Sequence, residues 1–257
     1  AGRQDSRLWQ IQISGPEKNY PGQDQVNVMS VNDRLILALD VHEHNYALEL
    51  VDKFSDYINI YKVGLELYGS CGPQIVEDIR RKGKKVFLDL KFHDIPNTVS
   101  KAAVAVTRLG VHMFNVHASG GLEMMKKCKD SIVEVCLKEN MERPKILGVT
   151  VLTSLSREIL RDELGIQYGL RTHVRHLSAL ALKAGLDGVV ASAREVEVIR
   201  NHCGKGFLIL TPGIRPSWTP PDDQKRTMTP KEAIREGADY LVLGRAVMQQ
   251  PDPLKAI

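Results

Sequence analysis

The stretch KVFLDLKFHD, residues 85–94, decides how the rest of the chain is understood. It opens as a short apolar run, which is typical of a strand buried on both faces of a parallel sheet. Asp89 and Lys91 then follow two residues apart, so an extended strand would point both to the same face. Charged side chains at the end of an apolar strand are costly to bury unless they are paired. The stretch therefore predicts a strand that ends in a functional site.

Segments of the same character recur on either side of this stretch. Each is a short run rich in Val, Ile or Leu, followed by a loop and a longer amphipathic segment. Three amphipathic segments end in a glycine just before the next apolar run, at Gly110, Gly185 and Gly237, which is the expected stop signal of a helix. The predicted strands are 34–40, 58–63, 85–90, 113–117, 146–152, 188–191, 207–211 and 240–243, and the main predicted helices are 46–54, 74–82, 98–109, 122–139, 172–184 and 231–236.

Eight such strand–helix units predict an α/β fold, a (β/α)8 TIM barrel formed by a single domain. The length of 257 residues is typical of one such barrel. An open, doubly wound sheet is the alternative, although the chain has no GxGxxG dinucleotide fingerprint. We assign the barrel to residues 33–257. Residues 1–32 are polar and lack sustained periodicity, so we expect a leader or partly ordered extension there.

Composition narrows the class of partner and the cellular location. The formal net charge is +4 with no Lys/Arg-rich run, which disfavours nucleic acid as a partner. No apolar run approaches the roughly 18 residues of a membrane span, and no secretory signal is recognisable. The four cysteines are scattered without a CxxC pair, which favours reduced thiols in a cytoplasmic protein. We expect no metal site, because the paired histidines lack a completing carboxylate or cysteine.

Functional residues of a (β/α)8 barrel lie at the C-terminal ends of its strands. The first three predicted strands contain Asp40, Lys62 and Asp89, Lys91 follows directly after the third, and Asp94 lies just beyond in the loop. A lysine held between carboxylates stays charged, and its ammonium can stabilise developing negative charge and then donate a proton. A buried ion-pair network with only a structural role is the alternative interpretation.

The last two strands end in residues suited to phosphate. Arg215 follows the seventh strand, and Gly244 and Arg245 follow the eighth directly before a helix. Loops after these strands form the usual phosphate site of the fold, and guanidinium groups match phosphate oxygens in pairs. Residues 213–229 form a long, polar, proline-rich loop, which is a candidate lid, and Gln224 within it could offer an amide to a phosphate.

In this order, these residues resemble the orotidine 5′-monophosphate decarboxylase family. The resemblance runs from Leu35 to about Met248, and the lid segment Asp223–Arg226 resembles the bacterial branch. It rests on the segments LALD (37–40), KVG (62–64), DLKFHDIPNT (89–98), VHASGG (116–121), VLTS (151–154), TPGIRP (211–216), DQKR (223–226) and LGR (243–245).

The resemblance implies cofactor-free and metal-free decarboxylation of orotidine 5′-monophosphate (OMP) to uridine 5′-monophosphate (UMP) in pyrimidine biosynthesis. Lys91 is then expected to protonate C6 of the pyrimidine, and Asp89 to lie against the departing carboxylate. Asp94 is expected to reach across a homodimer interface into the partner's site. Other implied contacts are the ribose hydroxyls for Asp40 and Lys62, the pyrimidine for Thr153 or Ser154, and the phosphate for Arg215, Gln224 and Arg245.

Two other functions remain open from the sequence alone. A related sugar-phosphate barrel, such as 3-keto-gulonate 6-phosphate decarboxylase, shares the Asp-x-Lys-x-x-Asp pattern but uses a divalent metal. A metal ligand would be expected there in place of Lys62, so Lys62 favours the metal-free chemistry. The second alternative is a barrel that binds a nucleotide without converting it, which the full set Asp89, Lys91 and Asp94 disfavours because a binding protein needs no such buried charge array.

Overall fold

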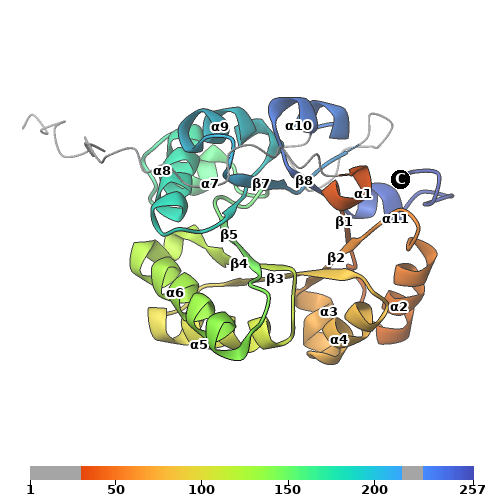
Figure 1. Cartoon of the computed structure of the whole chain (residues 1–257). Coiled ribbons are helices and arrows are strands. Elements are labelled where there is room, and N and C mark those ends of the chain that lie inside the picture. Colours follow the sequence, from red (N-terminus) through yellow and green to blue (C-terminus); the bar gives the residue numbers. More distant parts are fainter. Residues whose placement is uncertain (1–29, 216–227) are drawn as a thin grey trace, which may run out of the picture.

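The computed structural model describes residues 30–215 and 228–257. Eight parallel strands follow one another around a closed barrel, and helices surround it (Figure 1). The strands are β1 Leu35–Ala38, β2 Ile60–Gly64, β3 Lys85–Phe92, β4 Met113–His117, β5 Lys145–Val149, β6 Gly188–Val190, β7 Leu208–Thr211 and β8 Tyr240–Leu243.

Closure is shown by the pairing of the first strand with the last. Leu35 of β1 pairs with Leu241 of β8, and each remaining strand pairs in parallel with the next along the chain. The predicted single-domain (β/α)8 barrel is therefore confirmed, and the open doubly wound sheet is wrong. A closed barrel brings the C-terminal ends of all eight strands to one mouth.

The described helices include all six that the sequence predicted, with ends shifted by a few residues. The α-helices are α1 Val31–Arg34, α2 His44–Lys53, α3 Leu65–Cys71, α4 Gln74–Arg81, α5 Pro96–Arg108, α6 Gly121–Glu139, α7 Arg157–Asp162, α8 Leu170–Lys183, α9 Val196–Cys203, α10 Pro230–Glu236 and α11 Arg245–Met248, and the 3-10 turns are η1 Ala118–Gly120 and η2 Ala193–Glu195. Within the described ranges, no helix is long and apolar enough to cross a membrane.

Two apolar layers follow from the alternation of side chains along the strands. One set of strand residues fills the barrel interior, and the opposite set packs under the surrounding helices. The interior layer is made of Ile36, Ala38, Ile60, Phe87, Met113, Leu147, Val149, Val190, Leu210, Tyr240 and Val242. Because the same inward-facing positions continue toward the mouth, the next residues along each strand reach the floor of a pocket there.

The N-terminal boundary differs in detail from the sequence prediction. Arg34 was predicted to begin the first strand, but it ends the one-turn helix α1, and β1 begins at Leu35. Asn59 Nδ2 donates a hydrogen bond to Asp33 Oδ1, so α1 is attached to the N-terminal end of β2. Residues 1–29 of the predicted extension lie outside the described residues.

Candidate active site

A cavity of about 480 Å³ opens at the C-terminal ends of the strands. Its floor is the top of the interior apolar layer, and its walls carry the charged residues that the sequence singled out. The lining includes Asp40, Lys62, Asp89, Lys91, Thr153, Ser154, Arg215, Gly244 and Arg245. Nine of the eleven predicted site residues are therefore brought together at one mouth. Of the other two, Gln224 lies outside the described residues, and Asp94 is described below.

Four of these residues form a chain of alternating charge along one wall. Lys62 Nζ lies 2.9 Å from Asp40 Oδ1 and 3.6 Å from Asp89 Oδ2. Lys91 Nζ lies 2.7 Å from Asp89 Oδ1. The side chains of Lys62 and Asp89 are only 12% and 13% exposed, so their charges are poorly screened by solvent. The predicted convergence of these charges is observed.

Lys91, the last of these four charged residues, does not reach Asp89 through the regular alternation of side chains along a strand. Leu88 pairs with Phe114 and Phe92 pairs with Val116, so three residues of β3 lie opposite a single residue of β4. Lys91 within this bulge has φ of 50°, in the left-handed region that non-glycine residues rarely adopt. The local backbone therefore departs from the extended geometry that the sequence predicted, as bulges next to active sites commonly do.

The residue opposite the bulge is Asn115 of β4, which the sequence reasoning missed. Its side chain contacts both the backbone of Lys91 and the carboxylate of Asp89. A signal was present: Asn115 is the one polar residue between Met113 and His117 in an otherwise apolar strand, at an inward-facing position. A buried amide needs partners, and here both belong to the charged wall.

The ionisation of Asp89 is set by opposing effects. Burial acts to raise the pKa of this carboxyl. The ammonium groups of Lys62 and Lys91, with hydrogen bonds from Lys91 and Asn115, outweigh burial and lower the pKa below its ordinary value. Asp89 is therefore an anion at neutral pH, facing the same cavity as the Lys91 ammonium.

Asp94 lies apart from the cavity of its own chain. It follows β3 in the loop, is exposed, and accepts a hydrogen bond from the backbone N–H of Ile95. It is not among the residues that line the cavity, and the adjacent Ile95 side chain is 67% exposed. The expectation that one lysine is flanked by Asp89 and Asp94 is thus not met within a single chain.

Two arginines line the cavity just after β7 and β8. Arg215 follows β7, and its backbone N–H donates to the carbonyl of Met228, beside a bridge between Ile214 and Met228. These contacts join the chain on either side of residues 216–227, which lie outside the described residues. Arg245 begins α11, which is a single turn. Any anion held here must rely mainly on the guanidinium groups, because so short a helix has little dipole.

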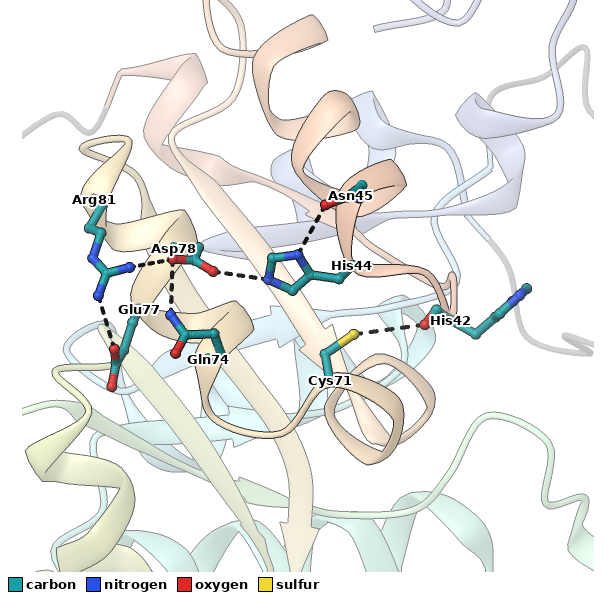
Figure 2. Close-up of polar contacts among 8 residues, drawn as sticks. All are labelled: His42, His44, Asn45, Cys71, Gln74, Glu77, Asp78 and Arg81. Atoms are coloured by element: carbon teal, nitrogen blue, oxygen red, sulfur yellow. Dashed lines mark hydrogen bonds and ion pairs between the residues drawn. The ribbon is translucent and has the colours of Figure 1, made fainter.

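A polar network supports the loop that follows β1 and carries Asp40. Figure 2 shows the Cys71 thiol directed at the backbone carbonyl of His42, with a sulfur–oxygen distance of 3.7 Å. The neighbouring His44 places its Nε2 2.9 Å from Asp78 Oδ2 on α4 (Figure 2). Side chains of α3 and α4 therefore contact the β1–α2 loop and the first residue of α2. These contacts restrain the backbone next to Asp40.

No group of three or more metal-ligating side chains occurs in the parts of the chain that are described.

His117, which ends β4, packs against the ring of His93. The rings of His93 and His117 lie 5.2 Å apart, tilted by 35°. Burial, followed by the nearby His93 and Lys91, lowers the pKa of His117, so its ring is neutral at pH 7. The pair packs beside the β3–α5 loop.

A closed barrel whose mouth gathers a series of paired lysines and carboxylates together with two arginines places the chain among the (β/α)8-barrel enzymes that act on small anionic substrates. Within that class, the chain belongs to the Orotidine 5'-phosphate decarboxylase / HUMPS family, whose profile matches residues 33–257. The prediction of this family from the sequence is confirmed.

Individual relatives agree with the family match. The chain is 50% identical over 228 residues to an orotidine 5'-phosphate decarboxylase from Moorella thermoacetica, covering 89% of this chain and 90% of the relative. It is also 50% identical to one from Geotalea uraniireducens, covering 87% and 91%. Among solved structures, an orotidine 5'-phosphate decarboxylase from Lactobacillus acidophilus matches with a TM-score of 0.75 and 36% identity, covering 86% of this chain and 94% of that one.

Proposed function

We propose that the chain decarboxylates OMP to UMP with Lys91 as the proton donor to C6. The activity follows from family membership and from about 50% identity to bacterial orotidine 5'-phosphate decarboxylases, so the predicted carboxy-lyase of pyrimidine biosynthesis is confirmed. The observation that carries the proposed mechanism is the wall of alternating charge, which ends in the Lys91 ammonium 2.7 Å from Asp89.

The reaction calls for a fixed cation at one carbon. When carbon dioxide leaves, an electron pair remains on C6, and no adjacent carbonyl can accept it. The Lys91 ammonium interacts more strongly with that carbanion-like state than with the uncharged starting carbon, which is the condition for catalysis. Lys91 then transfers a proton to C6, and the C6–H bond of UMP replaces the broken C6–carboxylate bond.

The remaining cavity residues are assigned to binding. Asp40 and Lys62 lie 2.9 Å apart next to Asp89, where they would hold ribose hydroxyls. Arg215 and Arg245, just after β7 and β8, would hold the phosphate together with Gln224. A Cβ added to Gly244 would lie 3.6 Å from Asp40 Oδ2, in ordinary van der Waals contact, so Gly244 lies directly beside this carboxylate.

Thr153 and Ser154 would contact the pyrimidine from the β5–α7 loop, since both line the cavity. Asp89 would lie against the substrate carboxylate before it departs. Phosphate binding remote from C6 could then drive closure of the cavity over the reacting carbon.

Lys62 supports this chemistry over that of a metal-dependent sugar-phosphate barrel. Its ammonium stands between the carboxylates of Asp40 and Asp89, which are the oxygen ligands that a divalent ion would use. A cation fixed at that point neutralises both carboxylates and repels a second cation. We accordingly propose that the reaction proceeds without metal or cofactor.

We further propose a homodimer in which Asp94 completes the partner's site. The support is that Asp94 is exposed, lies outside its own chain's cavity and is followed by the exposed apolar Ile95. A partner chain covering this loop would bury Ile95 and carry Asp94 toward a second Lys91. Mixing inactive Asp94→Ala and Lys91→Ala chains tests this, because exchange would restore one intact site in each mixed dimer, about a quarter of wild-type activity. No recovery after verified exchange would refute the shared site.

The cytoplasm remains our proposed location. All four cysteines are free thiols, which suits a reducing compartment.

The activity is tested by following the fall in ultraviolet absorbance as OMP becomes UMP, with and without a chelator. We expect the same rate in both. Turnover that requires added metal, or no turnover, would refute the proposed activity and favour that of the metal-dependent sugar-phosphate barrel.

A further inference from the structure

Asn115 contacts both charged residues of the candidate reaction centre, Asp89 and Lys91. Its side chain is buried in the middle of β4, with only 1% of the residue exposed. Its Oδ1 accepts a hydrogen bond from the backbone N–H of Lys91 at 2.8 Å, and its Nδ2 donates to Asp89 Oδ1 at 2.7 Å. Asp89 Oδ1 also receives the Lys91 ammonium at 2.7 Å, so three groups form a closed ring of contacts.

The orientation of the amide follows from its partners. A backbone N–H can only donate, so the atom facing Lys91 N must be the amide oxygen. An ionised carboxylate can only accept, so the atom facing Asp89 must be the amide nitrogen. Only a side chain with one donor and one acceptor at this spacing satisfies both neighbours, and asparagine meets this condition.

Asn115 also stands at the only position of β4 that faces the bulge. Residues 89–91 of β3 lie opposite it, between the pairs Leu88–Phe114 and Phe92–Val116. The regular ladder is interrupted there, and Lys91 adopts a left-handed backbone with φ of 50°. Such a conformation persists only where the surroundings hold it. The hydrogen bond from Lys91 N–H to Asn115 supplies the contact that the interrupted ladder cannot.

We propose that Asn115 is a positioning residue, which fixes the Lys91 ammonium relative to Asp89 by holding the backbone of one and the carboxylate of the other. This deepens, and rests on, the proposed role of Lys91 as proton donor. Asn115 is not among the residues that line the cavity, so it acts through its two partners. Because misplacement of a reacting group by about 1 Å can cost about 100-fold in rate, loss of Asn115 should lower kcat by about that factor. KM should change little, since Asn115 does not line the cavity that would bind the substrate.

Asn115→Asp gives a readout that a purely structural role would not produce. An ionised carboxylate has the same shape but cannot donate, and it repels Asp89. When protonated, the acid again offers one donor and one acceptor in the geometry of the amide. The titratable groups around this position are Asp89 and Lys91 of β3, Lys62 of β2, His117 of β4 and His93 in the following loop. Because these groups are present in both proteins, the ratio of variant to wild-type kcat removes their shared effect. That ratio should rise as the pH falls.

The experiment measures kcat and KM for OMP in wild type, Asn115→Asp and Asn115→Ser across pH 5–9. Asn115→Ser removes both contacts while leaving only a small polar void, so it provides a folded variant if the acid does not fold. Thr107→Val is the matched control, since Thr107 is only 1% exposed and its hydroxyl donates to Ala103 O within α5. We expect about a 100-fold lower kcat with KM within about threefold in both Asn115 variants, acidic recovery in Asn115→Asp, and unchanged kcat in the control.

Kcat within about twofold of wild type in a folded Asn115 variant would overturn the proposal. A loss of kcat that is equal at all pH values in Asn115→Asp and matched in the Thr107→Val control would also overturn it, because it would indicate general destabilisation. Failure of the proposed function is distinguishable, since wild type itself would then not decarboxylate OMP.

Discussion

Lys62→Met removes the cation at the centre of the charged wall while nearly preserving the shape of the side chain. Lys62 Nζ contacts Asp40 at 2.9 Å and Asp89 at 3.6 Å. The Asp40 side chain is 52% exposed, so that pair contributes at most about 1 kcal/mol. Asp89 is 13% exposed, and breaking a buried pair costs about 3–5 kcal/mol, but Lys91 still neutralises Asp89 from 2.7 Å. We expect the free energy of unfolding to fall by about 2–3 kcal/mol.

The same substitution should weaken catalysis. A hydrogen bond from a charged group to a ribose hydroxyl is worth about 1.5–3 kcal/mol, so kcat/KM should fall about 10- to 150-fold. The loss of Lys62 also removes a cation that lowers the pKa of Asp89, so the pKa of Asp89 should rise and activity should be lost at a higher pH on the acidic side. The assays are urea unfolding followed by circular dichroism, and initial rates of absorbance loss across pH.

Lys82→Met is the matched control. Lys82 Nζ lies 2.7 Å from Asp52 Oδ1, as close as any pair in the wall, but the two side chains are 33% and 63% exposed. We expect less than about 1 kcal/mol of destabilisation and unchanged kcat/KM. If Lys62→Met behaved like this control in both assays, the reasoning that burial makes the wall functional would be refuted.

Two further predictions concern the opposite end of the barrel, away from the chemistry. Burial, and then Lys145 and Lys85, lowers the pKa of His112 to about 4, below the value of about 6.5 in the unfolded chain. The unfolded state therefore binds the extra proton between about pH 6.5 and 4, and stability falls as the pH falls through that window. His112→Gln should reduce the dependence of the unfolding free energy on pH, by at most the roughly 1.4 kcal/mol per pH unit that one proton contributes. If urea titrations gave the same pH dependence for the variant and the wild type, His112 would not be the group responsible. Asp187→Ala should cost about 2–3 kcal/mol of unfolding free energy with unchanged kcat, because the Ile146 N–H loses its acceptor and Arg143 its ion pair. A large loss of kcat measured well below the melting temperature would show that this end is not purely structural.

The barrel could be predicted from the sequence because each strand is a short Val-, Ile- or Leu-rich run and each long helix is amphipathic. The glycines that stop three of these helices, Gly110, Gly185 and Gly237, all have the positive φ that the pattern predicts. Some short helices, such as α7 and α9, were missed, because so few turns do not always show a clear period.

The convergence of charged residues at the mouth of the barrel could be predicted, but the local geometry of these residues could not. Charged residues ending apolar strands indicated the wall, because such charges must be paired. The bulge in β3 was not predictable, because it depends on Asn115, which is 24 residues from Lys91 in sequence and meets it only across the β3–β4 ladder. The place of Asp94 outside its own cavity depends likewise on how the β3–α5 loop turns after Phe92.

Lys91→Ala removes the proposed proton donor. The measurement compares the rate of OMP absorbance loss with the affinity for UMP in the same preparation. We expect turnover to be nearly abolished while UMP still binds, because the two arginines and the proposed ribose contacts remain. Near-normal turnover in a folded Lys91→Ala enzyme would contradict the proposed role of Lys91.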